Sequence, residues 1–213
     1  MARTPSPYHH GSLRQALIDA TEALLAEKGA DGFSLREVAR RAGVSAAAPA
    51  HHFGDAAGLL TAVATLGFDG LARALEAGDA RGGSDARAAL REQGIEYVRY
   101  AMHHPGRFRL MFRSGQLHHD AALEQHGMAA FEVLARGVRR AFGVADAAAM
   151  TPTHWNTVTA LWSLVHGYAH LAIAGKLDPL CRGQGLEPFV AASLGPVLTA
   201  TIAGLIPGAG VAG

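Results

Sequence analysis

Apolar residues recur at helical spacing along most of the chain. Leu13, Leu17, Ala20 and Leu24 share one face of a helix predicted from about residue 13 to 28, and Gly29 is placed to end it. No stretch alternates apolar and polar residues over the length of a strand. Alanine and leucine dominate, while β-branched residues are sparse. The pattern predicts an all-α protein.

Helix caps and breakers divide the rest of the chain. Further helices are predicted over about 35–42, 45–52, 56–75, 86–103, 105–112, 120–142 and 152–174, and from 187 onward. The expected N-caps are Ser12, Ser34, Ser45, Asp55 and Thr151, and the first two begin capping-box patterns. A Gly- and charge-rich stretch at 77–85 reads as a loop. It separates a predicted first domain (1–76) from a second (77–207), followed by a tail (208–213).

Composition narrows the functional classes. The formal net charge is only +1, so bulk charge does not indicate a strongly basic nucleic-acid binder. The single cysteine, Cys181, and an N-terminus without an apolar signal region fit a cytoplasmic protein. The uncharged segment 189–206 approaches the length of a membrane span. Its small residues and central Pro196 favour a helix buried on several sides, including against a second chain, and no membrane partner is expected.

The second and third predicted helices have the helix-turn-helix pattern. Gly43 supplies a tight left-handed turn between them, and Val44 is the apolar residue expected to bury the corner. The following stretch, SAAAPAHH, carries small side chains that let a recognition helix approach base edges closely in the major groove. Its N-terminal N–H groups would face phosphate oxygens. Two histidines at its end can donate hydrogen bonds to phosphate or to base acceptors.

At these residues the sequence resembles the DNA-binding domain of TetR-type transcriptional regulators. YHHGSLRQALIDAT, GFSLREVARRAGVS and HHF carry the resemblance, which spans about residues 8–72. It implies binding to double-stranded DNA at a palindromic operator, with an N-terminal arm adding contacts. The candidate DNA-binding residues are Arg3, Tyr8, Ser34, Arg36, Ser45, Ala46, Ala47, Pro49, Ala50, His51 and His52.

Two positions depart from the family pattern. Ala50 and Ala56 stand where members usually carry a tyrosine and a lysine that contact backbone phosphate. Acidic and basic residues also cancel over residues 1–60. These features predict modest DNA affinity with a shallower salt dependence, compensated in part by the N-terminal arm.

The rest of the chain is similar to a C-terminal domain class named for a Trp-His-Gly signature, here Trp162 and His166-Gly167 within TALWSLVHGYAHL. The resemblance implies a small-molecule pocket and a homodimer through the last two helices. The pocket is expected to take a small, largely apolar effector, without cofactor or metal. The candidate ligand-binding residues are Tyr97, Phe108, Met111, Phe112, Met128, Phe131, Trp155, Thr159, Trp162 and His166.

Together these features predict a homodimeric repressor that the effector releases from its operator. One alternative is a degenerate regulator with weak or absent DNA binding that serves as a ligand- or partner-binding module. A second is an activator or a co-repressor-dependent regulator, which the sequence does not separate from a ligand-released repressor. A third is an enzyme, since His103-His104 and His118-His119 invite a metal site. Adjacent residues on a helix point about 100° apart and chelate poorly together, and no HExxH, GxSxG or phosphate-loop motif occurs. The sequence therefore does not indicate an enzyme.

Overall fold

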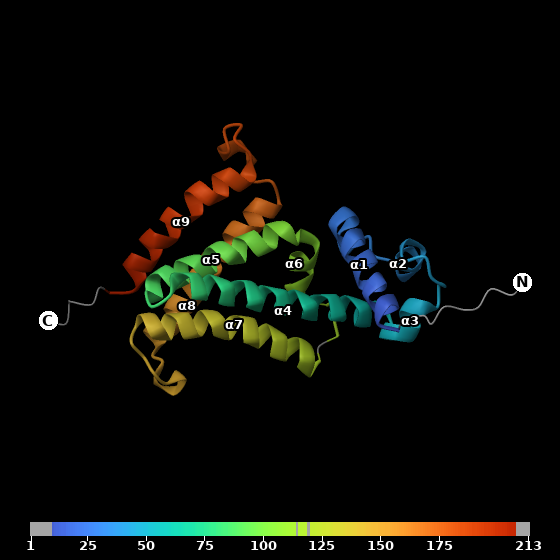
Figure 1. Cartoon of the computed structure of the whole chain (residues 1–213), viewed down its shortest axis with the longest axis horizontal. Coiled ribbons are helices and arrows are strands. Elements are labelled where there is room, and N and C mark those ends of the chain that lie inside the picture. The colour runs from blue at the N-terminus through green and yellow to red at the C-terminus, as the bar shows by residue number, and fades with distance from the viewer. Residues whose placement is uncertain (1–9, 114, 119, 208–213) are drawn as a thin grey trace, which may run out of the picture. The chain divides into compact units, whose positions relative to one another are not determined.

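The computed structural model describes residues 10–207 except 114 and 119. Over this range it contains nine α-helices, two short 3-10 helices and no strand, which confirms the all-α prediction (Figure 1). The α-helices are α1 (His10–Lys28), α2 (Leu35–Arg41), α3 (Ala48–Phe53), α4 (Ala56–Gly82), α5 (Ala86–His103), α6 (Pro105–Met111), α7 (Ala121–Ala141), α8 (Pro152–Ile173) and α9 (Leu186–Leu205).

One compact unit is formed by the described residues of 10–67 and 104–125. In it α1 packs against α2 and α6, and α2 packs against α3. Leu17 and Leu24 of the predicted apolar face are fully buried. Gly106 allows α6 to approach the backbone of α1, because a Cβ at this position would lie 2.8 Å from the amide nitrogen of Ala26.

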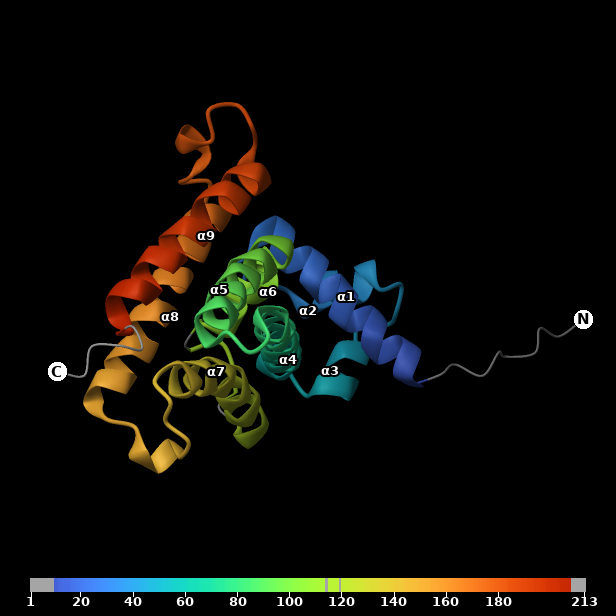
Figure 2. The same cartoon turned by 60° about the vertical axis from the view of Figure 1, so that its left-hand side comes forward.

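The second compact unit comprises the described residues of 68–103 and 126–207. Its central helix, α5, packs against both α8 and α9, which also contact each other (Figures 1 and 2). α5 and α9 are antiparallel: Arg87 donates to the carbonyl oxygen of Ile206 (2.9 Å) at one end, and His103 faces Glu187 at the other. The two helices meet closely at Gly94, where a Cβ would lie 2.8 Å from a leucine methyl of α9.

Several predicted helix ends are confirmed. Asp55 caps α4, because its carboxylate accepts the N–H of Gly58 (2.8 Å). Thr151 caps α8, and the His154 ring accepts the Thr151 N–H (3.0 Å), so the two residues form a reciprocal capping box. Gly43 adopts φ +68, as the tight turn requires.

Other predicted caps are wrong. α1 begins at His10, which places Ser12 inside its first turn, and Gln15 donates to the Asp19 carboxylate (2.8 Å) instead of forming a capping box. α3 begins at Ala48 with Ala47 as its N-cap, so Ser45 lies outside the cap. Ser34 does occupy the N-cap of α2, but its side chain makes no capping hydrogen bond.

The loop predicted at 77–85 is largely helical. α4 continues to Gly82, and Gly83 (φ +60) begins the short turn into α5. Helix propensity from the alanines around Gly78 outweighs the glycines and charges that suggested a loop. By length and composition alone, α4 and α9 could each cross a membrane, with 44% and 22% of their most apolar windows buried. Buried core helices share these properties, so they are weak evidence for a membrane span.

Candidate DNA-binding surface and ligand site

The helix-turn-helix is built as its sequence predicts. α2 and α3 pack together, and the turn between them begins with Gly43 in the left-handed region. The Val44 N–H donates to the carbonyl oxygen of Ala39 (3.0 Å), which fixes the turn against the end of α2. Val44 itself is half-buried, and Val38 and Ala39 of α2 are fully buried. The core therefore holds α3 at a defined angle while leaving its outer face open.

Most of the predicted DNA contacts within the described residues are exposed: Ser34 and Arg36 at the start of α2, Ser45, Ala46 and Ala47 before α3, and Ala50 and His51 in α3. His52 is half-buried. Pro49, in the first turn of α3, is buried, unlike the other candidates. Arg3 and Tyr8 of the N-terminal arm lie outside the described residues.

Arginines near this surface are largely neutralised by carboxylates. Arg41 donates to both carboxylate oxygens of Glu27 (2.8 and 2.6 Å), and it also donates to Glu37 (3.0 Å). Arg40 donates twice to Glu37 (2.8 Å each). Hydrogen bonds from Arg40 and then Arg41 lower the pKa of Glu37 to about 2. Arg36 is exposed and, among the described residues, has no ion pair, so it is the arginine of α2 best placed to meet a phosphate.

The segment after α6 holds the start of α4. The His118 backbone N–H donates to the Thr61 hydroxyl (2.8 Å), and its ring Nε2 lies 3.0 Å from the Asp55 carboxylate that caps α4. Arg113 forms an ion pair with Asp31 in the turn between α1 and α2. Sequence patterns do not reveal these contacts, since no local pattern relates residues 57 to 82 positions apart.

The predicted ligand-binding residues fall into two sets. Phe108, Met111 and Phe112 belong to the first unit, where the rings of Phe108 and Phe112 lie 5.1 Å apart and Phe108 is fully buried. The others belong to the second unit: Tyr97, Met128, Phe131, Trp155, Thr159, Trp162 and His166. The sequence therefore proposed candidates in both units, but it did not distinguish residues of the hydrophobic core from residues that line a ligand cavity.

Within the second unit, five of these residues form one aromatic cluster. Phe131 of α7 stacks on Trp155 with ring centroids 6.4 Å apart, and it meets Trp162 edge-on at 5.8 Å. Trp162 lies 6.2 Å from the His166 ring, which is joined to Tyr97 of α5 by a 2.8 Å hydrogen bond. We refer to these five residues as the aromatic cluster. Three of the candidates on α8, Trp155, Trp162 and His166, therefore lie together in one spatial group.

The cluster combines an open face with a buried polar end. Trp155 and Trp162 remain 42% and 38% exposed, and Met128 nearby is 62% exposed. Burial raises the pKa of Tyr97, and burial together with the charge of His170 lowers the pKa of His166. Both side chains are therefore neutral near pH 7. Such a site suits an uncharged, planar molecule.

Family comparisons agree with this geometry. The model of bacterial regulatory proteins of the tetR family matches residues 17–63, which include α2, the turn and α3. A second model, described as the tetracyclin repressor-like C-terminal domain, matches residues 90–192. The chain belongs to the TetR family. Its first part is a helix-turn-helix DNA-binding domain of that family, and the protein is a transcriptional regulator.

Solved structures of TetR-like proteins share the fold. A protein of unknown function from Rhodococcus sp. RHA1 is 33% identical, with a TM-score of 0.73 over 95% of this chain and 100% of its own. PfmR, a TetR family transcriptional regulator from Thermus thermophilus, is 21% identical (TM-score 0.61, 97% and 98% covered). A TetR variant from Acinetobacter baumannii AYE in complex with minocycline is 20% identical (TM-score 0.58, 94% and 99% covered). None of the curated proteins compared with the chain matches it.

Proposed function

We propose that this TetR-family regulator is a homodimeric repressor that binds a palindromic operator and is released by a small, largely apolar ligand. TetR regulators bind DNA and small-molecule effectors, and the matches point to regulators rather than enzymes. The observation that carries the proposal is the run of small exposed residues Ser45, Ala46 and Ala47 that leads into α3, followed by exposed Ala50 in the helix itself. It stands on a turn and a helix that are held by buried Val38 and by the ion pairs of Arg41.

The exposed surfaces of α8 and α9 support the homodimer. α9 carries no charged residue after Glu187, yet only 22% of its apolar window is buried within the chain. Val197 of α9 and Leu171 of α8 are 43% and 48% exposed. Around them lie small exposed side chains that allow helices to approach closely, including Ser163 and Gly167. A second copy of the chain is the partner that would cover this surface in a closed two-fold assembly, in agreement with a cytoplasmic protein.

The aromatic cluster supports the ligand. Its neutral Tyr97–His166 pair and its two tryptophans offer stacking surfaces and few charges. The assignment to the Trp-His-Gly class stays a prediction. Release from DNA would require the ligand to bind the released conformation more tightly than the DNA-binding conformation. Within the first unit, α6 contacts α4 at Gly67, where a Cβ would lie 2.6 Å from the Met111 sulfur, so a shift of α6 would move the start of α4.

Footprinting on the DNA upstream of the protein's own gene tests the operator. We expect two protected half-sites whose centres are one helical turn, or a multiple of it, apart. Ala47→Glu should abolish protection, because Ala47 is exposed beside α3 and a carboxylate there would repel phosphate. Ala122→Glu, at an exposed position of α7, is the matched control and should bind normally. Equal protection by both variants would contradict the placement of the DNA-binding face.

Intrinsic fluorescence tests the ligand site. The chain contains only two tryptophans, Trp155 and Trp162, and both belong to the aromatic cluster. A panel of uncharged aromatic compounds should therefore include members that quench this fluorescence saturably and lower operator affinity. Compounds that quench without changing DNA affinity would favour the alternative of a ligand-binding module without regulated DNA binding.

A further inference from the structure

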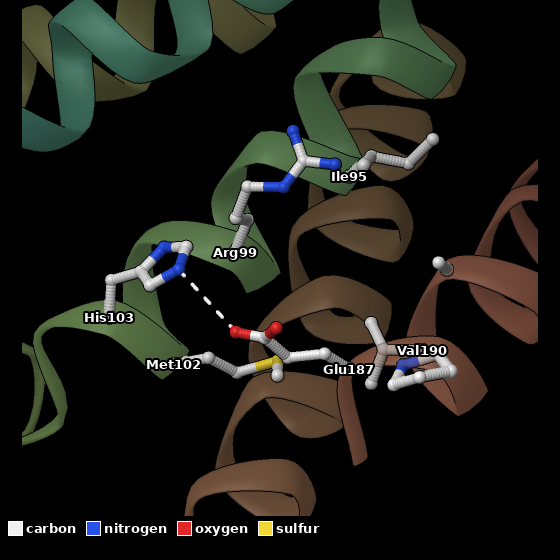
Figure 3. Close-up of a pocket in the computed structure, with 8 residues that line it drawn as sticks. Ile95, Arg99, Met102, His103, Glu187 and Val190 are labelled. Carbon is white, nitrogen blue, oxygen red and sulfur yellow. Dashed lines mark ion pairs between the residues drawn. The ribbon is translucent and has the colours of Figure 1, made fainter. Parts of the chain in front are cut away.

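A surface groove in the second unit lies between the C-terminal half of α5 and the start of α9. It has a volume of about 380 Å³ and is lined by Ile95, Arg99, Met102, His103, Glu187, Pro188, Val190 and Ala191 (Figure 3). This volume is within the range of small-molecule sites. The groove opens where the antiparallel helices diverge, beyond their close contact at Gly94. None of its lining residues belongs to the aromatic cluster, so it is a separate site.

Apolar side chains form much of the groove wall. Ile95 and Met102 are seven residues apart on α5 and face the same side of that helix, while Val190 comes from α9 (Figure 3). Val190 is only 8% exposed, so it forms the floor. These residues offer a surface on which a short alkyl chain or a small ring can be buried.

Charge is supplied mainly by Arg99. Among the described residues, three arginines share two glutamates in an ion-pair network: Arg81 with Glu92 (3.7 Å) and Glu96 (2.5 Å), Arg91 with Glu92 (3.0 Å), and Arg99 with Glu96. One positive charge of this network is therefore uncompensated. Arg99 is the member that lines the groove, and its side chain is 53% exposed. Its planar guanidinium is suited to a carboxylate.

The remaining charged residues pair with each other across the groove. His103 Nε2 lies 3.6 Å from the Glu187 carboxylate, and the two side chains are 56% and 74% exposed (Figure 3). Such an exposed pair is weak and can rearrange when a ligand enters. A proton on His103 would offset the Glu187 charge, so that the pair opposes an incoming anion less than a free carboxylate would.

We propose that the α5–α9 groove binds a small amphipathic carboxylate, with its head on Arg99 and its apolar body on Ile95, Met102 and Val190. This site is independent of operator binding and of the effector site proposed above. The ligand class follows from an apolar floor beside the guanidinium of Arg99, which belongs to an ion-pair network with one more arginine than glutamate.

Methionine methyl NMR tests the proposal with octanoate as the probe. The chain has five methionines; Met102 lines the groove, and exposed Met128 reports on the vicinity of the aromatic cluster. Protein labelled with ¹³C at the methionine methyls is titrated, and the two signals are assigned with Met102→Leu and Met128→Leu. The Met102 signal should shift saturably while that of Met128 stays in place.

Matched probes and variants isolate the role of the charge. Octanol and octylammonium carry the same alkyl chain and should bind more weakly than octanoate. Arg99→Gln should weaken octanoate binding roughly tenfold or more, since a charge-assisted hydrogen bond is lost. Arg99→Lys keeps the charge and should retain most of the affinity. Arg91→Gln removes the same charge from the ion-pair network but lies outside the groove, so it should weaken octanoate binding clearly less than Arg99→Gln does.

Three results would overturn the proposal. They are a shift of Met128 without Met102, equal binding of octanol and octanoate, or stronger binding of octylammonium. The last would make Glu187 the residue that selects the charge. Because the titration needs no DNA, failure here leaves the operator proposal standing, and loss of operator binding leaves the groove untouched.

Discussion

Substitution of Gly167 by alanine probes the proposed two-fold interface directly. Gly167 is an exposed residue in the middle of α8, and a Cβ added there would meet no atom within 4 Å in the single chain. In an isolated chain, Gly167→Ala should therefore stabilise α8 by about 1 kcal/mol through helix propensity alone. If a second copy packs closely at this position, the same methyl group has to be accommodated between two helices.

The expected magnitude follows from close packing. Helices that pack through small residues approach to about 8–10 Å between axes, and an extra methylene in such a contact costs about 1–3 kcal/mol. The two-fold places the substitution in the interface twice. Two substitutions at the lower value of about 1 kcal/mol each weaken the free energy of dimerisation by about 2 kcal/mol. This corresponds to a rise of about thirtyfold in the dimer dissociation constant.

Sedimentation equilibrium of the purified protein measures this constant. Gly127→Ala on α7 is the matched control, because its Cβ would make only ordinary contact with the Phe68 ring at 3.8 Å. Both variants should be folded, and only Gly167→Ala should dissociate at higher concentration. If Gly167→Ala dimerised as tightly as the original chain, the reasoning that places this face of α8 in the interface would be refuted.

Three further predictions concern the first unit. Ala56→Lys should restore a phosphate contact and steepen the dependence of log affinity on log salt by about 0.9, measured by anisotropy over a salt series; an unchanged slope would show that residue 56 does not reach DNA. Gly106→Ala should lower the free energy of unfolding by about 1–3 kcal/mol in urea, because its Cβ would lie 2.8 Å from the Ala26 nitrogen; a neutral effect would mean that α6 can move away freely. The pKa of Glu37 falls from 4.5 to about 2 on folding, so its stabilising contribution is complete above pH 4.5 and is lost as the pH falls towards 2. Glu37→Gln should flatten this part of the pH–stability profile measured by circular dichroism, and an unaltered profile would assign the acid sensitivity to other carboxylates.

Local sequence signals predict most of the helices and the helix-turn-helix. Gly43, Asp55 and Thr151 were assignable because each acts through hydrogen bonds or dihedral angles within a few residues. Ser12 and Ser45 are not N-caps, because α1 begins before Ser12 and α3 begins after Ser45. A serine near a helix start is only one of several possible N-caps. In an alanine-rich sequence the start of a helix can shift by a few residues at little cost in free energy.

The aromatic cluster, the ion pairs between helices and the α5–α9 groove depend on contacts between residues that are distant in the sequence. The stripe of Trp155, Trp162 and His166 could be predicted from helical spacing, but its partner Phe131 across α7 was only one candidate wall among several. The ion pair of Arg41 with Glu27 joins two helices and has no sequence signature. The groove at Arg99 escaped prediction for the same reason, since it exists only where α9 returns alongside α5.

The central claim is that this chain recognises a specific DNA site as a dimer. Fluorescence anisotropy with labelled DNA from upstream of its own gene tests it most directly, at two salt concentrations and with unrelated DNA as competitor. We expect saturable binding of two chains per operator, which survives competitor DNA and weakens as the salt concentration rises. Binding with no preference over unrelated DNA, even at low salt, would contradict specific recognition of this DNA. It would indicate that alanine at positions 50 and 56 has disabled DNA recognition by the helix-turn-helix.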